Sequence, residues 1–315
     1  MSNLKVIVII LSSIVVQFCM VQDAISQNRK VSVSFDDLPI HGDIKHAVYV
    51  NKTLVGTLHE HDIPAIGFVN EEKLYRDAKP DSVLLGLLRL WLESGLDLGN
   101  HTYSHIFINQ ATIDEYKEDV IRGEQLTRPL VNSFGKELTY FRHTQLRTGP
   151  TDEFREELAS FLHERGYTIA PVTIDNDEYI YAYCYEKAQE NGEEELMKKI
   201  GADYLAYMEN TFEYFEKLSV DFLGYEPNQI LLLHANLLNA DYFGELANML
   251  KNRGYQFISL NEALKDEAYQ LPEGTHQRGP SWIQRWMIYE GKEVPEQPGV
   301  SNFVQRLFRE YQEAS

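Results

Sequence analysis

Seven short apolar runs, separated by segments with helical periodicity, constrain the fold of this chain more than any other feature. Several of the runs are continuously apolar or β-branched rather than alternating in polarity, which is typical of strands buried on both faces of a parallel sheet. Strands joined through helices predict a single-domain α/β fold, namely a distorted (β/α) barrel of about seven parallel strands. A doubly wound open sheet is the alternative. The predicted strands span residues 31–35, 65–69, 96–99, 138–142, 168–174, 229–233 and 256–260.

Helical periodicity is clearest at Ser82–Glu93, Asp114–Val131 and Asp152–Glu164. Glycine follows three of the helical segments and leads directly into a predicted strand in each case. Glycine tolerates the left-handed conformation that ends a helix, so these positions mark helix ends. They are Gly95, Gly166 and Gly254.

Residues 1–26 resemble a secretory signal peptide. Lys5 precedes an apolar core from Val6 to Val16, and small residues follow before an expected cleavage after Ser26. The core is shorter than the ~20 residues that a membrane-spanning helix needs. We therefore expect a secreted or periplasmic protein without stable membrane insertion; an uncleaved membrane tether is the alternative.

The remaining chain is expected to form a catalytic domain over residues 27–265, with a helical insertion at about 180–225. The insertion starts with a tyrosine-rich piece, Tyr179–Tyr185, whose tyrosines either line a groove for sugar rings or pack the insertion onto the barrel. Residues 266–315 form a tail that we expect to pack on the barrel. Within it Trp282 and Trp286 are four residues apart and would share one helix face.

Charge and cysteine content exclude several classes of protein. The formal charge of −19 argues against nucleic acid as a partner and makes a polyanionic polymer an unfavourable substrate. Of the two cysteines, Cys19 lies in the expected signal peptide, so Cys184 is alone in the mature chain. Neither an intrachain disulfide nor a thiolate zinc cluster is then possible, and any metal would be held by histidine and carboxylate. The oligomeric state is left open.

Chemically active side chains stand at the carboxyl ends of the predicted strands. In a (β/α) barrel these ends converge on one face, where catalytic groups lie. Carboxylate and imidazole groups gathered there are what a catalytic zinc site requires. The residues are Asp36, Asp37, His101, His105, Arg142, Asp175 and His234.

Each motif also has a structural interpretation. The pair Asp36-Asp37 could cap a helix, and His234 could be a hydrogen-bonded histidine at a strand end. The spacing of His101 and His105 would place both imidazoles on one side of a helical turn, but histidine pairs also occur on surfaces. Because several predicted strand ends each carry such a residue, one shared site is favoured over these separate structural roles.

These motifs, in this order, resemble those of the polysaccharide deacetylases of carbohydrate esterase family 4, the chitooligosaccharide deacetylase homology domain. The resemblance covers roughly residues 30–265. It rests on Ser34-Phe-Asp-Asp37, His101-Thr-Tyr-Ser-His105, Tyr140-Phe-Arg142, Val172-Thr-Ile-Asp175 and Leu232-Leu-His234.

The resemblance implies a role for each residue. Asp37, His101 and His105 would bind a divalent metal, and zinc is the expected metal. Asp36 would be the general base and His234 the acid that protonates the leaving group.

The same resemblance implies supporting roles for five further residues. Arg142 would hold Asp36 ionised, and Asp175 would orient His234. Leu232 would help to form the pocket for the acetyl methyl group, and the backbone N–H of Gln145 would be a second oxyanion donor. Tyr179 would lie in the substrate groove.

Two departures from the family pattern affect substrate contacts. Thr144 stands where a proline is usual after the arginine motif. Glu178 and Tyr179 occupy the places of the usual aspartate and tryptophan. The substrate, and the choice between N- and O-deacetylation, therefore stay open.

The expected function is that of a secreted, metal-dependent carbohydrate deacetylase, acting on a chitin-like oligomer, peptidoglycan or xylan. A metal-dependent hydrolase of a small non-peptide amide is one alternative. A non-catalytic carbohydrate-binding protein is another, although the motifs keep every expected metal ligand and proton-transfer residue.

Overall fold

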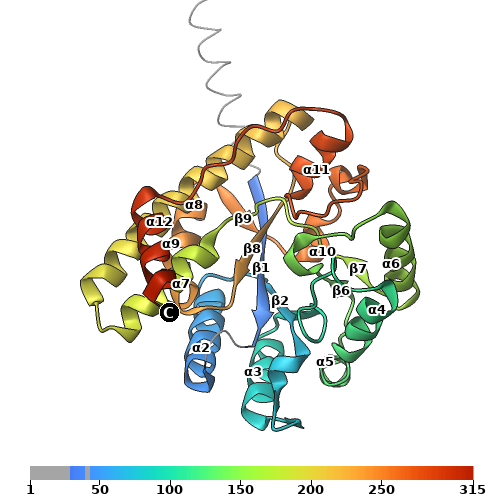
Figure 1. The fold of residues 1–315 in the computed structure, drawn as a ribbon, viewed down its shortest axis with the longest axis horizontal. Coiled ribbons are helices and arrows are strands. Elements are labelled where there is room, and N and C mark those ends of the chain that lie inside the picture. The colour runs from blue at the N-terminus through green and yellow to red at the C-terminus, as the bar shows by residue number, and fades with distance from the viewer. Residues whose placement is uncertain (1–28, 40–42, 315) are drawn as a thin grey trace, which may run out of the picture.

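The computed structural model describes residues 29–39 and 43–314, and within them seven parallel strands form one sheet (Figure 1). The strand order is β7-β6-β5-β2-β1-β8, and β9 pairs with the first residues of β1. All seven predicted strands are present, although several are shorter than expected. Their bounds are β1 (Arg29–Leu38), β2 (Ile66–Val69), β5 (Asp97–Asn100), β6 (Tyr140–Phe141), β7 (Thr168–Ile169), β8 (Gln229–His234) and β9 (Tyr255–Phe257).

The sheet curls so that its two edges meet. The segment that follows β7 reaches β8, where Ile174 forms a parallel bridge with Leu231. The backbone N–H of Ile174 donates to Ile230 O over 3.0 Å, and that of Leu232 donates to Ile174 O over 3.2 Å. The expected distorted barrel is therefore confirmed, and the open sheet is not formed.

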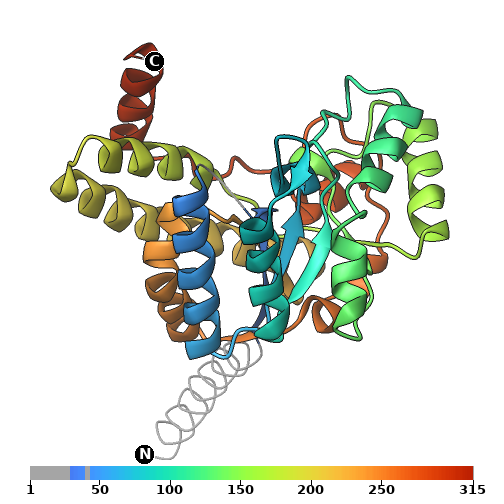
Figure 2. The same cartoon turned by 90° about the horizontal axis from the view of Figure 1, so that it is seen from below.

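Helices cover the outside of the barrel (Figures 1 and 2). Local signals start several of them: Asp43 and Asp81 cap α2 and α3, and Thr112 and Glu115 form a capping box at α4. The longer helices are α2 (Ile44–Glu60), α3 (Ser82–Glu93), α4 (Ile113–Arg122), α5 (Thr127–Ser133), α6 (Asp152–Glu164), α7 (Glu178–Glu190), α8 (Glu194–Leu223) and α9 (Leu237–Asn252). The three predicted helix-ending glycines all have positive φ.

The core lies between strands and helices. Phe35 on β1 is fully buried and makes edge-to-face contacts with Trp91 of α3 and Phe243 of α9. This packing holds the central strand against two helices, so the residues at its carboxyl end have a rigid support.

One local prediction is wrong, and one element was not predicted. The helix expected over 114–131 is two helices, α4 and α5, because the chain turns at Gly123. Gly123 packs against the backbone of Thr102, where a Cβ atom would lie 2.6 Å from the carbonyl carbon. A short antiparallel hairpin, β3 (Tyr75–Arg76) and β4 (Lys79–Pro80), was not predicted. It follows the 3-10 helix η1 (Glu71–Leu74).

The region after β7 is helical, and its tyrosines divide between two environments. On α7, Tyr181 and Tyr185 are buried in the core, whereas Tyr179 and Tyr183 line the cavity described below. The packing interpretation of the tyrosine-rich piece therefore holds for Tyr181 and Tyr185, while a sugar-binding role for the other two tyrosines stays a prediction. The alternation arises because α7 is a helix with one face toward the core.

The last residues form three more helices and a 3-10 helix: α10 (Leu260–Ala263), η3 (Glu267–Gln270), α11 (Trp282–Tyr289) and α12 (Asn302–Ala314). Trp282 and Trp286 are both buried on α11. α12 lies beside α7, where Phe308 makes an edge-to-face contact with Tyr183 (Figure 1). A further 3-10 helix, η2 (Thr144–Leu146), lies in the loop after Arg142.

The expected signal peptide and its cleavage site lie outside the described residues. Across residues 29–39 and 43–314, no helix is long and apolar enough to span a membrane. Cys184 is buried and free.

Candidate metal-dependent active site

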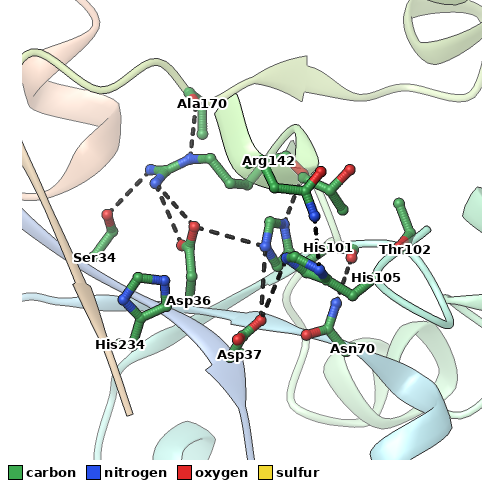
Figure 3. A network of polar contacts seen from close by, with 12 residues as sticks. Ser34, Asp36, Asp37, Asn70, His101, Thr102, His105, Arg142, Ala170 and His234 are labelled. Atoms are coloured by element: carbon green, nitrogen blue, oxygen red, sulfur yellow. Dashed lines mark hydrogen bonds and ion pairs between the residues drawn. The ribbon is translucent and has the colours of Figure 1, made fainter. Parts of the chain in front are cut away.

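The carboxyl ends of four strands bring the predicted residues together (Figure 3). Asp36 and Asp37 lie near the end of β1, and His234 ends β8 directly beside them, since Asp36 is in register with His234. The loop after β5 contributes His101 and His105, and Arg142 follows β6. Asp36 and Asp37 do not cap α2, because Asp43 does.

Three side chains converge as a metal site requires. The Oδ1 atom of Asp37 lies 3.8 Å from Nε2 of His101 and 3.8 Å from Nε2 of His105. Asp37, His101 and His105 are a group whose ligand atoms all lie within 4.8 Å of one another. Asp37 Oδ1 is buried and accepts no hydrogen bond from any described residue, so it offers a free lone pair to a cation. One carboxylate and two imidazoles suit zinc.

The two histidines reach this site from a loop rather than from a helical turn, as their spacing had suggested. Thr102 has a φ of 68° and His105 a φ of 55°, so the chain twice adopts the left-handed region between the ligands. Asn70 supports the loop by donating from Nδ2 to His101 O over 2.6 Å. The imidazole rings meet edge to face, 5.0 Å apart.

Hydrogen bonds orient both rings toward the metal position. Nδ1 of His101 lies 2.8 Å from Arg142 O, to which it donates when Nε2 is the ligand atom. Nε2 of Gln145 lies 3.0 Å from Nδ1 of His105. A metal-bound His105 with Nε2 as the ligand atom carries a proton on Nδ1, so the Gln145 carboxamide would have to turn its oxygen, which has no other hydrogen-bond partner, toward the ring. The Gln145 side chain therefore contacts the ring of His105, a contact that the sequence did not predict.

Electrostatics favour the protonation states that a metal needs. Burial lowers the pKa of His101 and of His105 to about 4, so both rings are neutral at physiological pH. Burial alone would raise the pKa of Asp37, but Lys73 and the three nearby histidines hold it well below its usual range. The ligands are therefore a carboxylate and two neutral imidazoles.

Asp36 is held beside this group by Arg142. Asp36 is 3% exposed and Arg142 is fully buried, and Nη1 of Arg142 donates to Asp36 Oδ1 over 3.3 Å. Arg142 also donates to Ser34 Oγ and Ala170 O, which fixes its guanidinium (Figure 3). Burial raises the pKa of Asp36, and Arg142 opposes that shift without cancelling it. Arg142 therefore favours the ionised form of Asp36, but burial has the larger effect on its pKa, and the expectation that Arg142 keeps Asp36 ionised stays a prediction.

The partner of His234 differs from the prediction. Nδ1 of His234 lies 2.8 Å from Oε1 of Glu178, at the start of α7, and not beside Asp175. Glu178 is 1% exposed and also accepts hydrogen bonds from Asn236 and Asn239. The assignment of Asp175 as the residue that orients His234 was wrong, because the helical turn after Asp175 carries Glu178 to the ring instead.

Asp175 lies in the same cavity without an ion-pair partner among the described residues. Its Oδ1 accepts a hydrogen bond from the backbone N–H of Asn176 over 2.9 Å. Burial raises the pKa of Asp175 to about 7. Asp175 is thus a wall residue of the cavity and not part of the histidine pair.

A cavity of about 460 Å³ opens onto these groups. The predicted residues Leu232, Gln145 and Tyr179 all line it, and Tyr179 is 52% exposed. Gln145 has a φ of 49°, which turns its peptide within the loop that follows Arg142. The cavity joins the metal ligands, both proton-transfer candidates and the face of α7, so a substrate can contact all of them at once.

Two residues of the site escaped the sequence interpretation. Glu178 was noted only as a departure from the family pattern, and its position in place of an aspartate was the available signal. Lys73, on η1, lies 3.5 Å from Asp37 Oδ1 through its Nζ atom. Nothing in the sequence around Lys73 distinguishes it from a surface lysine.

Comparison with known proteins agrees with the motifs. The sequence model of the polysaccharide deacetylase family matches residues 24–169, a segment that includes the three predicted metal ligands, Asp36 and Arg142. His234 and Glu178 lie beyond that segment. No match was found among curated protein sequences.

Several solved structures are similar over three quarters of the chain. The peptidoglycan deacetylase PdaC from Bacillus subtilis is 16% identical, with 76% of this chain and 93% of that chain covered and a TM-score of 0.47. A family 4 carbohydrate esterase from Streptomyces lividans, in complex with acetate, is 18% identical, with 75% and 96% covered and a TM-score of 0.45. A CE4 family pseudoenzyme from Bacillus anthracis is 14% identical, with 76% and 66% covered and a TM-score of 0.46.

Proposed function

We propose that this protein is a zinc-dependent deacetylase of a glycan, and the match of the polysaccharide deacetylase family model to residues 24–169 supports this proposal. One observation carries the proposal. Asp37, His101 and His105 surround a single point, while Asp36 and His234 stand beside it in the same cavity. A metal site flanked by two groups that can transfer protons is what hydrolysis of an acetyl group needs.

Each residue then has a defined task. Held by Asp37, His101 and His105, zinc would supply a Lewis acid that polarises the acetyl carbonyl and lowers the pKa of water. Asp36 accepts the proton of the attacking water on its carboxylate. His234 donates a proton to the departing amine or hydroxyl from Nε2, because its Nδ1 is engaged by Glu178.

Two other residues contact the acetyl group in this proposal. The backbone N–H of Gln145 faces the developing oxyanion, and Leu232 contacts the methyl group. Both line the cavity that contains the metal ligands. Arg142 acts through Asp36, whose orientation it holds by a buried ion pair.

The charge of the cavity wall favours neutral or amino-sugar glycans. Asp175, Asp177 and Glu186 line the cavity, and no lysine or arginine is among its described lining residues. Asp177 and Glu186 form no ion pair within the described part of the chain, so an acidic sugar would meet negative charge on this wall. Tyr179 and Tyr183 on the same wall offer ring faces to a sugar. We therefore place neutral and amino-sugar glycans, such as chitin-like oligomers, ahead of acidic polymers.

Acetate release tests the proposal. The purified protein is incubated with N-acetylated chitooligosaccharides, acetylated xylan and peptidoglycan, each with and without a zinc chelator. We expect acetate from at least one glycan, loss of activity with chelator, and recovery when zinc is restored. Zinc-loaded protein that releases no acetate from any glycan contradicts the proposal. A small acetylated amide is included in the screen, and acetate released from it alone identifies the alternative substrate class.

We also propose that the protein is exported and that residues 1–26 are removed. The support is the basic start and short apolar core of this segment. Expression with the native N-terminus, followed by mass measurement of the protein outside the cytoplasm, is the test. Cleavage after Ser26 gives a chain that begins at Gln27; a full-length chain in the membrane fraction indicates the tether instead.

A further inference from the structure

Lys73 lies beside the carboxylate expected to bind the metal. Its Nζ atom is 3.5 Å from Asp37 Oδ1 and donates a hydrogen bond to Asp37 O over 3.2 Å. The same Oδ1 atom is the one that faces both imidazoles. A cation of the protein therefore shares the oxygen that a metal ion would use.

The 3-10 helix η1 that carries Lys73 also supports the histidine loop. The backbone N–H groups of Glu71 and Glu72 donate to Thr102 O and Tyr103 O over 3.3 and 3.0 Å. The buried Glu71 carboxylate accepts hydrogen bonds from the backbone N–H groups of Leu126 and Thr127. Lys73 thus projects from a segment that is anchored on both sides, so its ammonium is positioned rather than free to swing away.

The ammonium group is mostly withdrawn from solvent. The Lys73 side chain is 27% exposed and that of Asp37 is 17% exposed. At this burial, charges are screened less than at the surface, and an ammonium and a divalent cation near the same oxygen repel each other. The cation also draws electron density from Asp37 Oδ1, which makes that oxygen a weaker metal donor.

We propose that Lys73 is a positioning residue that holds Asp37 in place and lowers the affinity of the site for its metal. The backbone hydrogen bond fixes Asp37, whose φ is 71°, while the charge limits how tightly a divalent cation binds. The site then has a rigid ligand set with an exchangeable metal. The proposal rests on the metal site of the proposed function, although it does not depend on the substrate.

The two parts of this role have opposite consequences for zinc binding when Lys73 is replaced. Loss of support alone weakens binding, because a mobile carboxylate is a poorer ligand. Loss of the charge strengthens it, because the repulsion is removed. We expect the charge effect to dominate, since the imidazoles stay oriented by Arg142 and Gln145.

Zinc affinity of the full chain is measured by competition with a chromophoric chelator at fixed pH and ionic strength. The variants are K73M and K73Q, which remove the charge, and K73R, which keeps it. K79M is the matched control, because Lys79 lies on the exposed hairpin strand β4. Circular dichroism confirms that each variant is folded.

We expect K73M and K73Q to bind zinc at least about tenfold more tightly than the unmodified chain, as removal of a close like charge predicts. K73R and K79M should stay within about threefold of it. Unchanged or weaker binding by folded K73M and K73Q overturns the proposal. Because the readout is metal binding, a failure to release acetate from any glycan would overturn the proposed function and leave this result standing.

Discussion

Glu178 holds His234 by two hydrogen bonds to the same carboxylate oxygen. Oε1 of Glu178 is 2.8 Å from Nδ1 of the His234 ring and 2.7 Å from the backbone N of His234. Burial by itself lowers the pKa of His234, but the hydrogen bond and charge of Glu178 raise it, with help from Asp37 and Asp36, to about 9. The ring is therefore protonated at neutral pH and ready to donate a proton.

Replacing Glu178 by glutamine should shift the pH dependence of the reaction. A group with a raised pKa stays protonated below that pKa, so activity that needs protonated His234 is present at neutral pH and lost as pH rises through about 9. In E178Q the pH above which kcat/KM falls should move down toward ~6.5, the ordinary pKa of histidine. We call this fall at high pH the basic limb of the profile. At pH 8 we expect kcat/KM to fall by about tenfold or more.

The fall of kcat/KM at low pH, the acidic limb of the same pH profile, provides an internal check. Asp36 must be deprotonated to act as a base, and burial raises its pKa, so activity should fall above the usual carboxylate range as pH decreases. E178Q should leave this limb in place. Glu190, exposed at the end of α7, supplies the control E190Q, with both limbs unchanged. A basic limb that does not move in E178Q would show that Glu178 does not set the protonation of His234.

The adjacent carboxylates Asp36 and Asp37 should separate catalysis from metal binding. D36N keeps the metal ligands and removes the base, so we expect full zinc occupancy with kcat lowered by about 10²- to 10⁴-fold. D37N removes a ligand, so zinc content itself should fall. Metal analysis and acetate release are measured on the same samples; zinc loss in D36N, or activity in D36N equal to that of the unmodified chain, contradicts these assignments.

The acidic wall of the cavity should determine the response to substrate charge. The double variant D177N/E186Q removes two negative charges from positions that line the cavity. We expect the ratio of kcat/KM for a partly deacetylated chitooligosaccharide to that for a fully acetylated one to fall by about five- to tenfold. E190Q is again the control, because Glu190 is on the same helix but outside the cavity. A ratio that is unchanged in the double variant would exclude electrostatic selection by this wall.

Gly123 should be needed for the shape of the histidine loop. A Cβ atom there would lie 2.6 Å from Thr102 C and 2.8 Å from Tyr103 N, both backbone atoms. G123A should therefore push the loop away, weaken zinc binding, and lower the free energy of unfolding by about 1–3 kcal/mol. The control is G56A, because a Cβ at Gly56 in α2 meets nothing within 4 Å. G56A should stabilise the protein by about 0.5–1 kcal/mol, measured by chemical denaturation.

Much of the fold could be predicted because its signals are local. Several buried strands are largely apolar runs, and the glycines that end helices precede strands in the sequence itself. The convergence of Asp36, Asp37, His101 and His105 also followed, since carboxyl ends of parallel strands meet at one face. The break at Gly123 did not follow, because it depends on a contact with Thr102, 21 residues away in the chain.

The alternation of strand-like and helical segments by itself predicted the barrel and placed the motifs at one face, because the carboxyl ends of parallel strands meet there. The choice of metal ligands and proton-transfer residues came from the resemblance of the motifs to the family and stays a prediction. Only the tertiary structure decided that Glu178 rather than Asp175 contacts His234, and that Lys73 contacts Asp37. These pairs join segments that are distant in sequence. Their distances depend on how α7 and η1 pack against the strand ends, which no local pattern specifies.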